Sequence, residues 1–423
     1  VMKALSFLKE RLRLSFLYHL LCICAGCLFF SLQSLAATKT SSGSGNWNSG
    51  SSWIPTGVPA SGDNVVIAAG HTITINTNTS TIASLTINGT LIIGNNNTNR
   101  TVTVSGDVII NSGGIFYTAG NGGNNLYIGG DLTNNGSFDM NIGSADATVT
   151  FDGSASQTIT GSGSTNDFST VTINNTGSTN NNIVEIMSSG FTAAAGFLTL
   201  SKGVLKMSGS YSFTNTFFSS AGPTIHSDEG IWLNNANVTV TGQNGDTQLY
   251  GLLRVTAGTY NIGVSADWWL AYYSGSQIIV EGGVLNVSGA ICGATTSETT
   301  TYTQNAGTVT VNTAGNNYSV ASFELWSSGS VFNMSGGSIV MQKAAAVFTD
   351  YVNYAATSVV TGGKVQAGNA STPASAIFWI NSTPSLYDLD VNGINNPLFQ
   401  LRSNTTVLHD IVINGILDAA TQN

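Results

Sequence analysis

The sequence has few charged residues, few cysteines and few prolines, and it shows almost no helix-forming pattern. Only 8% of the 423 residues are charged, against about 25% in a typical soluble domain, so Asn, Thr, Ser and Gly must cover most of the surface. After residue 36 the chain has a single cysteine, Cys292, which excludes an internal disulfide and a cysteine-based metal site. The composition has 49 Gly and only six Pro, and it is rich in Val, Ile and Thr; it therefore favours β-strands joined by tight turns.

The first 36 residues differ from the rest of the chain. Four basic residues between positions 3 and 13 precede an apolar run from Leu14 to Leu32, and small residues follow it. This pattern predicts a secretory signal peptide over residues 1–36; a membrane anchor is the alternative, because the apolar run is long. Without this segment the chain has eight basic and 20 acidic residues, a net charge of −12. That balance excludes the basic face that nucleic-acid binding needs, and we expect no membrane span in the mature chain.

Glycine-containing phrases recur along the chain. In the second half, the second glycine of successive copies falls at 258, 283, 307, 337 and 363. Apolar residues alternate with polar ones after these glycines, as at Leu285 and Val287, which is typical of strands with one buried face. Short strands at this period, without helices between them, predict an all-β fold: a right-handed parallel β-helix of roughly 15–17 coils. We place this solenoid at 77–423, after an N-terminal cap and first strands at 37–76.

Few titratable residues could carry chemistry. His226, Asp228 and Glu229 form the densest cluster; metal ligation or acid–base chemistry is conceivable there, but a polar loop at a coil corner is the simpler interpretation. Asp388 and Asp390 share the outward face of a strand, which indicates a solvated surface, with a weakly bound surface calcium as the alternative. His409 is expected to be structural. We therefore expect no catalytic residue, no dedicated metal site and no cofactor.

Aromatic residues give a better lead than the titratable ones. In the run that begins at Asp267, Trp269 and Tyr273 have the same strand parity and should face outward. Glu324 and Trp326 alternate with apolar residues and would extend this surface. Separated aromatic rings can stack on sugars, so these four residues are the candidate glycan-binding site; aromatics packed under a neighbouring loop are the alternative.

The segment 45–76 combines two tryptophans with loop-forming residues. An open solenoid end exposes unpaired backbone and an apolar core, so an element that covers the end is expected just after the signal peptide. We predict that Trp47 and Trp53 cover the first coil and that Pro59 discourages further strand addition. Asp63 is expected to cap a turn before the next strand.

The same segment carries a family resemblance. Gly45 and Trp47, followed by Trp53, Pro59 and a strand after Asp63, resemble the opening of large secreted surface β-helix proteins of Gram-negative bacteria. Many of these are adhesin-like and end in a sorting domain for type IX secretion. The resemblance implies a β-helix at the cell surface and implies no enzyme. The chain ends just after a repeat phrase without such a domain, so we expect it to be truncated at its C-terminus, with Ile416 and Leu417 on an unfinished coil.

The sequence therefore predicts a non-enzymatic, secreted or cell-surface structural protein, adhesin-like and monomeric, on the outer surface of a Gram-negative bacterium. Its expected partners are glycans or a neighbouring cell surface, and nucleic acid is excluded. The alternative function is a polysaccharide-binding or polysaccharide-degrading β-helix, of the lyase or hydrolase kind.

Overall fold

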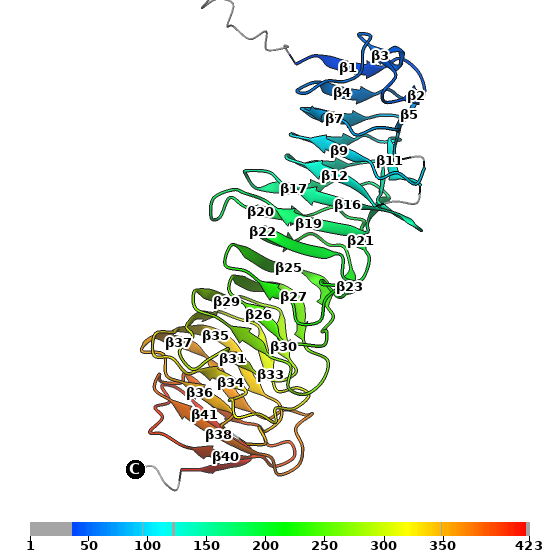
Figure 1. Cartoon of the computed structure of the whole chain (residues 1–423). Helices are drawn as coiled ribbons and strands as arrows, with labels where there is room; N and C mark the ends of the chain where they lie inside the picture. The colour runs from blue at the N-terminus through cyan, green and yellow to red at the C-terminus, as the bar shows by residue number, and fades with distance from the viewer. Residues whose placement is uncertain (1–35, 95, 121–122, 348, 420–423) are drawn as a thin grey trace, which may run out of the picture.

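The molecule is an elongated stack of β-strand turns (Figure 1). The computed structural model describes residues 36–94, 96–120, 123–347 and 349–419. The predicted signal peptide thus lies outside the described residues, apart from its last position. Parallel strands stack as a β-solenoid of about 16 turns, which confirms the predicted architecture and its size.

The described strands belong to three sheets. The long sheet contains β1 (Thr38–Ser41), β3 (Trp53–Ile54), β4 (Asn64–Ile67), β6 (Thr81–Ile82), β7 (Ser84–Ile87), β9 (Thr101–Val104), β10 (Val108–Ile110), β12 (Asn124–Ile128), β13 (Leu132–Asn134), β15 (Asn141–Ile142), β16 (Ala145–Phe151), β17 (Gln157–Thr160), β19 (Thr170–Asn174), β20 (Ile183–Ile186), β22 (Leu198–Met207), β23 (Phe213–Asn215), β25 (Glu229–Val240), β27 (Leu252–Ile262), β29 (Ser276–Val280), β30 (Val284–Val287), β32 (Thr300–Gln304), β33 (Thr308–Val311), β35 (Val331–Met341), β37 (Thr357–Ala367), β39 (Asp388–Val391) and β41 (Ile411–Ile413). The N-terminal side sheet contains β2 (Gly45–Asn46), β5 (Thr72–Ile75), β8 (Thr90–Ile93), β11 (Ile115–Thr118), β14 (Ser137–Asp139), β18 (Thr165–Phe168) and β21 (Phe191–Ala193). The C-terminal side sheet contains β24 (Thr224–Ile225), β26 (Thr247–Leu249), β28 (Leu270–Tyr272), β31 (Ile291–Gly293), β34 (Phe323–Leu325), β36 (Tyr351–Asn353), β38 (Ile377–Ser382), β40 (Leu398–Leu401) and β42 (Ile416–Asp418). One short 3-10 helix, η1, covers Gly50–Ser52.

Alternation of apolar and polar residues fills the interior. In β4, Val65 and Ile67 are fully buried, and Val65 stacks in register on Leu85 of the next turn. Burial of each such side chain contributes about 1.5–3 kcal/mol. Because most turns repeat this pattern, the buried apolar core continues from Trp47 to Phe399.

Glycine and asparagine occupy turns between the strands and bends within the long strands. The glycines of the second-half repeat, including Gly258, Gly307 and Gly363, have positive φ angles of 88°, 74° and 85°, which glycine adopts without strain. Asparagines of adjacent turns also hydrogen-bond to each other, as Asn111 Nδ2 does to Asn88 Oδ1 at 2.7 Å. Both features tie one turn to the next.

The longest strands bend around a corner of the solenoid. β25, for example, pairs with β27 on both sides of a register shift after Leu233. The bend lets one strand contribute to two faces of the same turn, and it explains how β22, β25, β27, β35 and β37 reach ten or more residues.

The first turn places both predicted cap tryptophans inside. Trp47 and Trp53 are each 1% exposed, and their rings meet edge-to-face at 5.0 Å. Trp53 Nε1 also donates to Trp47 O at 2.9 Å. β3 pairs antiparallel with β1 beside the parallel stack, at the end where the N-terminal strands lie (Figure 1). This position supports the cap, whose role stays a prediction.

The other two residues of the expected cap are also buried. Asp63 is 2% exposed. Its Oδ2 accepts from Ala60 N at 2.8 Å, which closes the expected turn, and its Oδ1 accepts from Ala37 N at 3.0 Å. Pro59 is buried beside this turn. Asp63 therefore ties β1 to the segment that leads into β4.

At the opposite end, the last described turn is open. Ile416 is 48% exposed on β42, and Leu417 is half-buried. In the part of the chain that the structure describes, no helix is long and apolar enough to cross a bilayer.

Candidate functional site

The C-terminal side sheet holds the four residues that the sequence suggests for glycan binding. β28 is shorter than expected and covers only Leu270–Tyr272, so Trp269 and Tyr273 lie just outside it. Both are half-buried. The Trp269 ring meets Tyr318 edge-on at 5.4 Å, which matches the alternative of an aromatic packed against a neighbouring loop.

Glu324 differs from its expected outward position. It is 4% exposed, and its Oε2 accepts from Ala321 N at 2.9 Å. Burial raises the pKa of this carboxyl. The turn before β34 folds back onto the side chain, so Glu324 is not an accessible sugar contact.

Four aromatic residues line up along the C-terminal side sheet. Tyr250, Tyr273, Trp326 and Tyr354 each follow the last residue of a strand, and the register pairs Leu249 with Tyr272 and Leu325 with Asn353. We call these four the aromatic row. Tyr250 and Tyr273 stack at 3.9 Å with an interplanar angle of 12°, and Trp326 meets Tyr354 at 5.3 Å.

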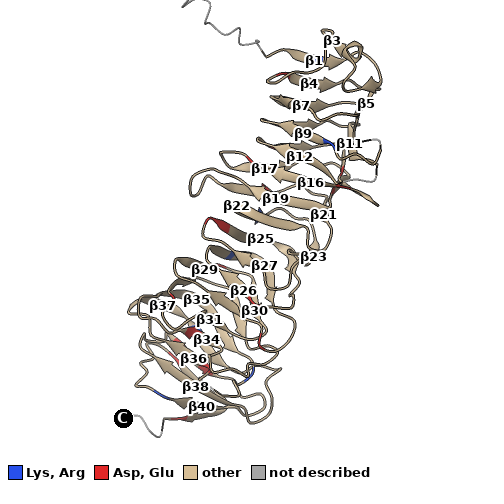
Figure 2. Cartoon of the chain, viewed as in Figure 1, with Lys and Arg blue, Asp and Glu red and all other residues tan. Residues whose placement is uncertain are grey.

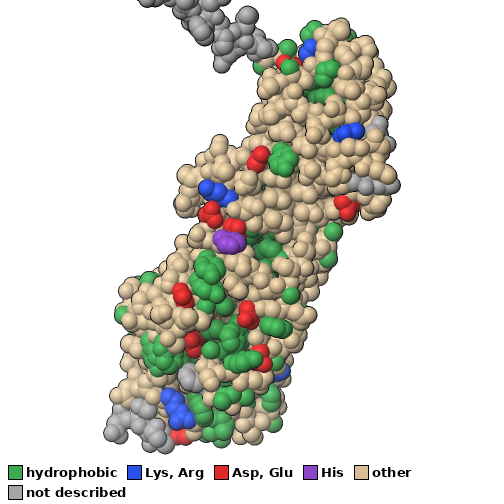
Figure 3. All heavy atoms as spheres, in the orientation of Figure 1, with side chains coloured by type: hydrophobic (Ala, Val, Ile, Leu, Met, Phe, Trp, Pro, Cys, Tyr) green, Lys and Arg blue, Asp and Glu red, His purple; other side chains and the backbone are tan. Residues whose placement is uncertain are grey.

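The aromatic row is partly open to solvent. Its members are half-buried, and hydrophobic side chains gather over the C-terminal half of the face in Figure 3. The sequence points to Tyr273 and Trp326 but not to Tyr250 or Tyr354. Only the strand register shows that these positions are equivalent, so sequence reasoning had no signal for them beyond residue type.

The His226 cluster is arranged differently from the expected strand alternation. His226 Nδ1 contacts Glu229 Oε2 at 3.0 Å, and the same oxygen accepts from His226 N at 2.7 Å. The partner is thus Glu229, whose side chain is 3% exposed, and not Asp228. The pair closes a turn before β25, in agreement with the interpretation of a polar corner loop.

A groove of about 430 Å³ lies beside this turn on the outward face of the long sheet. Lys202, Asp228, Glu229 and Arg254 all line it. The structure thus brings two basic and two acidic side chains together from three successive turns. Elsewhere charged residues are scattered thinly along the solenoid (Figure 2).

A stack of side chains from adjacent strands forms one side of the groove. The Trp232 ring lies between Lys206 Nζ, 4.2 Å from the ring centroid, and Arg254 Cζ, 3.9 Å from it. Lys206 also pairs with Glu185 at 2.9 Å, and Arg254 donates two hydrogen bonds to Glu281 at 2.8 and 2.9 Å. The guanidinium holds the pKa of Glu281 below its usual range. We call these five residues the Trp232 stack.

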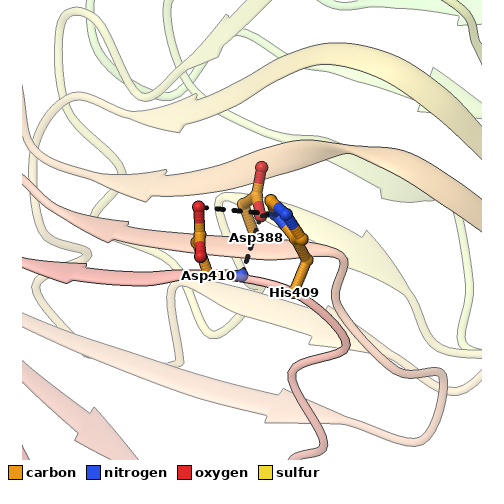
Figure 4. A group of neighbouring side chains, drawn as sticks. All are labelled: Asp388, His409 and Asp410. Atoms are coloured by element: carbon orange, nitrogen blue, oxygen red, sulfur yellow. Dashed lines mark hydrogen bonds and ion pairs between the residues drawn. The ribbon is translucent and has the colours of Figure 1, made fainter.

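Asp388 and His409 meet Asp410 at the C-terminal end of the long sheet (Figure 4). His409 Nδ1 lies 2.9 Å from Asp388 Oδ1 and 3.4 Å from Asp410 Oδ2. The hydrogen bond to Asp388, followed by the charge of Asp410, raises the pKa of this exposed imidazole.

Asp390 has a separate partner, Lys364 Nζ at 2.9 Å. The two aspartates of β39 therefore have different partners, His409 for Asp388 and Lys364 for Asp390. One ligand atom from each of Asp388, His409 and Asp410 lies within 4.8 Å of the others, and His409 Nδ1 already contacts both carboxylates. A weakly bound surface calcium at Asp388 and Asp390 stays a prediction.

Residues 47–217 match the family model of the G8 domain. G8 domains occur in secreted and extracellular β-helix-like proteins, which agrees with the solenoid and with an extracellular protein. No curated protein and no solved structure matches the chain.

The G8 region and the candidate sites overlap only in part. The region spans the buried tryptophan pair and ends after β23. Lys202 lies inside it, whereas Asp228 and Arg254 lie beyond it, so the groove crosses its C-terminal boundary. The aromatic row and the Asp388 cluster lie outside the G8 region.

Proposed function

We propose that the protein works outside the cell as a non-enzymatic structural rod, adhesin-like, on the surface of a Gram-negative bacterium. The observation that carries this proposal is the solenoid itself, about 16 parallel turns on one continuous core. Such a stack presents a long wall that is mostly uncharged. Its stability is a sum over many similar turns, so it does not depend on any single site. The G8 match supports the extracellular setting.

Several charged side chains support a structural role because they pair with one another. Glu185 with Lys206, Arg254 with Glu281, and Lys364 with Asp390 each bridge adjacent turns. These pairs link strands along the axis and are not arranged around a reacting group. Export through type IX secretion is part of the proposal and rests on the resemblance of residues 45–76.

Surface display and adhesion test this function together. Antibody labelling of intact cells should reach the protein, and beads coated with the full chain should adhere to neighbouring cells or their matrix more than beads coated with albumin. Labelling only after the outer membrane is opened would contradict the surface location. Release of new reducing ends from added polysaccharides would favour the degrading alternative instead.

Glycan binding through the aromatic row is the second candidate function. The row offers half-buried Tyr and Trp side chains as two pairs, each on neighbouring turns, with the turn of β31 between the pairs, and such rings can stack on sugar faces. A glycan array would test it with the wild type, Tyr273→Ala and Trp326→Ala. We expect the bound glycans to be lost in both variants, whereas an unchanged array would contradict this candidate.

A further inference from the structure

The groove beside the Trp232 stack crosses several turns of the long sheet. Its floor is a column of outward-facing residues in register: Ile183, Val204, Gly230 and Leu252. The column continues to Gln277 of β29, so the groove runs over five strands, about 19 Å at the usual strand spacing of about 4.8 Å. Gly230 has no side chain, and the side chains of Val204 and Leu252 close over its position, so the floor is continuous.

One side of the groove is held rigid before any ligand arrives. Trp232 is clamped between two cations, and its Nε1 donates to Thr256 Oγ1 at 2.8 Å. Thr256 Oγ1 in turn donates to Glu281 Oε2 at 3.0 Å. Because these side chains are already ordered, binding of a ligand at this wall would cost little side-chain entropy, and this favours binding.

Polar groups and balanced charges surround the apolar floor. The residues that line the groove include Asp228, Lys202, Gln277 and the loop amides Asn180 and Asn182. Two basic and two acidic side chains line it, so the groove has no excess charge to attract a polyanion or a polycation. Its volume lies within the range of about 300–1,000 Å³ that small-ligand pockets occupy.

We infer that this groove binds an extended, uncharged polysaccharide along the solenoid axis. The apolar floor would contact the C–H faces of successive sugars, and the amides and the exposed Asp228 carboxylate at the edges would bond their hydroxyl groups. A sugar repeat in an extended chain is close to the strand spacing, so neighbouring turns can contact neighbouring sugars. An extended peptide fits less well, because the strand backbone below is already paired in parallel ladders and offers it no partners.

Calorimetry with defined oligosaccharides tests this inference on the full chain. The probes are β-1,4-linked hexasaccharides of glucose, xylose and mannose, with hexagalacturonate as the acidic probe and a neutral Gly-Ser-Thr decapeptide as the peptide probe. We expect at least one neutral hexasaccharide to bind. The double variant Asp228→Ala/Gln277→Ala removes two exposed groups of the groove and should weaken that binding at least tenfold.

The matched control is Thr303→Ala. Thr303 lies on the same sheet in register with Ile279, one turn further along, and it does not line the groove. It should bind as the wild type does, and circular dichroism and melting temperatures should show that both variants fold. Three results would each overturn the inference: no neutral hexasaccharide binds, hexagalacturonate or the peptide binds more tightly, or the double variant binds like the wild type. Oligosaccharide binding in the groove does not require adhesion. Failure of the coated beads to adhere would therefore not contradict this inference.

Discussion

The backbone of Gly307 has a φ of +74°, a left-handed conformation that costs other residues about 1–2 kcal/mol. A Cβ atom at this position would also lie 2.6 Å from the carbonyl oxygens of Gly282 and Gly283 on the preceding turn. The repeat glycines are therefore needed both for the conformation of the chain and for the close approach of two turns.

Substitution of Gly307 by Ala should thus lower the melting temperature for two reasons. Gly275→Ala separates the cost of the positive φ from the cost of the contact between turns. Gly275 has a φ of +91° but open space around its Cβ position. Gly43→Ala serves as the control, since Gly43 also has open space and a φ that is not positive. We expect the largest loss for Gly307→Ala, a smaller one for Gly275→Ala and none for Gly43→Ala. Equal losses at 307 and 275 would show that the contact between turns is unimportant.

A second residue-scale prediction concerns protonation of His409. Its raised pKa means that the folded state favours the imidazolium. The contribution to stability is therefore complete below the ordinary pKa of about 6.5 and is lost as the pH rises through the higher folded value. Asp388→Asn should return the pKa of His409 toward its ordinary value, as measured by an NMR titration of the imidazole. Asp390→Asn should leave it unchanged because Asp390 pairs with Lys364; equal effects of the two variants would contradict the assignment.

At the scale of strands, much of the fold could be predicted, because local pattern and burial agree. Leu85 and Ile87 alternate with polar residues in the sequence, and both are buried in β7. For Glu324, the local pattern does not predict the observed burial. Its strand parity is outward, yet a turn covers it, and no local pattern states which outward positions a loop will cover.

The candidate sites were harder to predict than the strands. Lys206, Trp232 and Arg254 are far apart in the sequence, and only the register of β22, β25 and β27 places them in one stack. Without the register, Trp232 has no feature that separates it from a core aromatic. Because the length of the repeat varies from turn to turn, the spacing in the sequence does not predict which residues become neighbours.

The N-terminal turn gives a prediction at the same scale. Trp53→Ala would remove a side chain that is 1% exposed, at a cost of about 3–5 kcal/mol. In a solenoid each turn contacts only its neighbours, so the loss should concentrate near the end. Hydrogen exchange should then accelerate in β1, β4 and β5 and stay unchanged in β27. Ile54→Ala is the control, since Ile54 lies in the same short strand but is 61% exposed; equal acceleration in both variants would argue against the cap.

For the whole molecule, the two ends of the solenoid differ in a way that affects association. The N-terminal end buries its tryptophans, whereas Ile411 and Ile413 of β41 are 50% and 47% exposed. Among the described strands β41 pairs with β39 alone, so within this part of the chain its other edge is a surface for strand pairing. A monomeric rod thus requires this edge to be covered or to repel a second copy.

The 423-residue chain should therefore self-associate through its last turn as its concentration rises. Apolar side chains beside an open strand edge favour pairing with a second chain, and lysines on such an edge prevent it by repulsion and desolvation. Sedimentation velocity of the full chain should show dimers or larger species, and Ile411→Lys/Ile413→Lys should restore the monomer. Ile142→Lys is the control, because Ile142 is 38% exposed but lies on β15, far from the last turn. Association that persists in the double variant, or that disappears in the Ile142 variant, would locate the contact elsewhere on the rod.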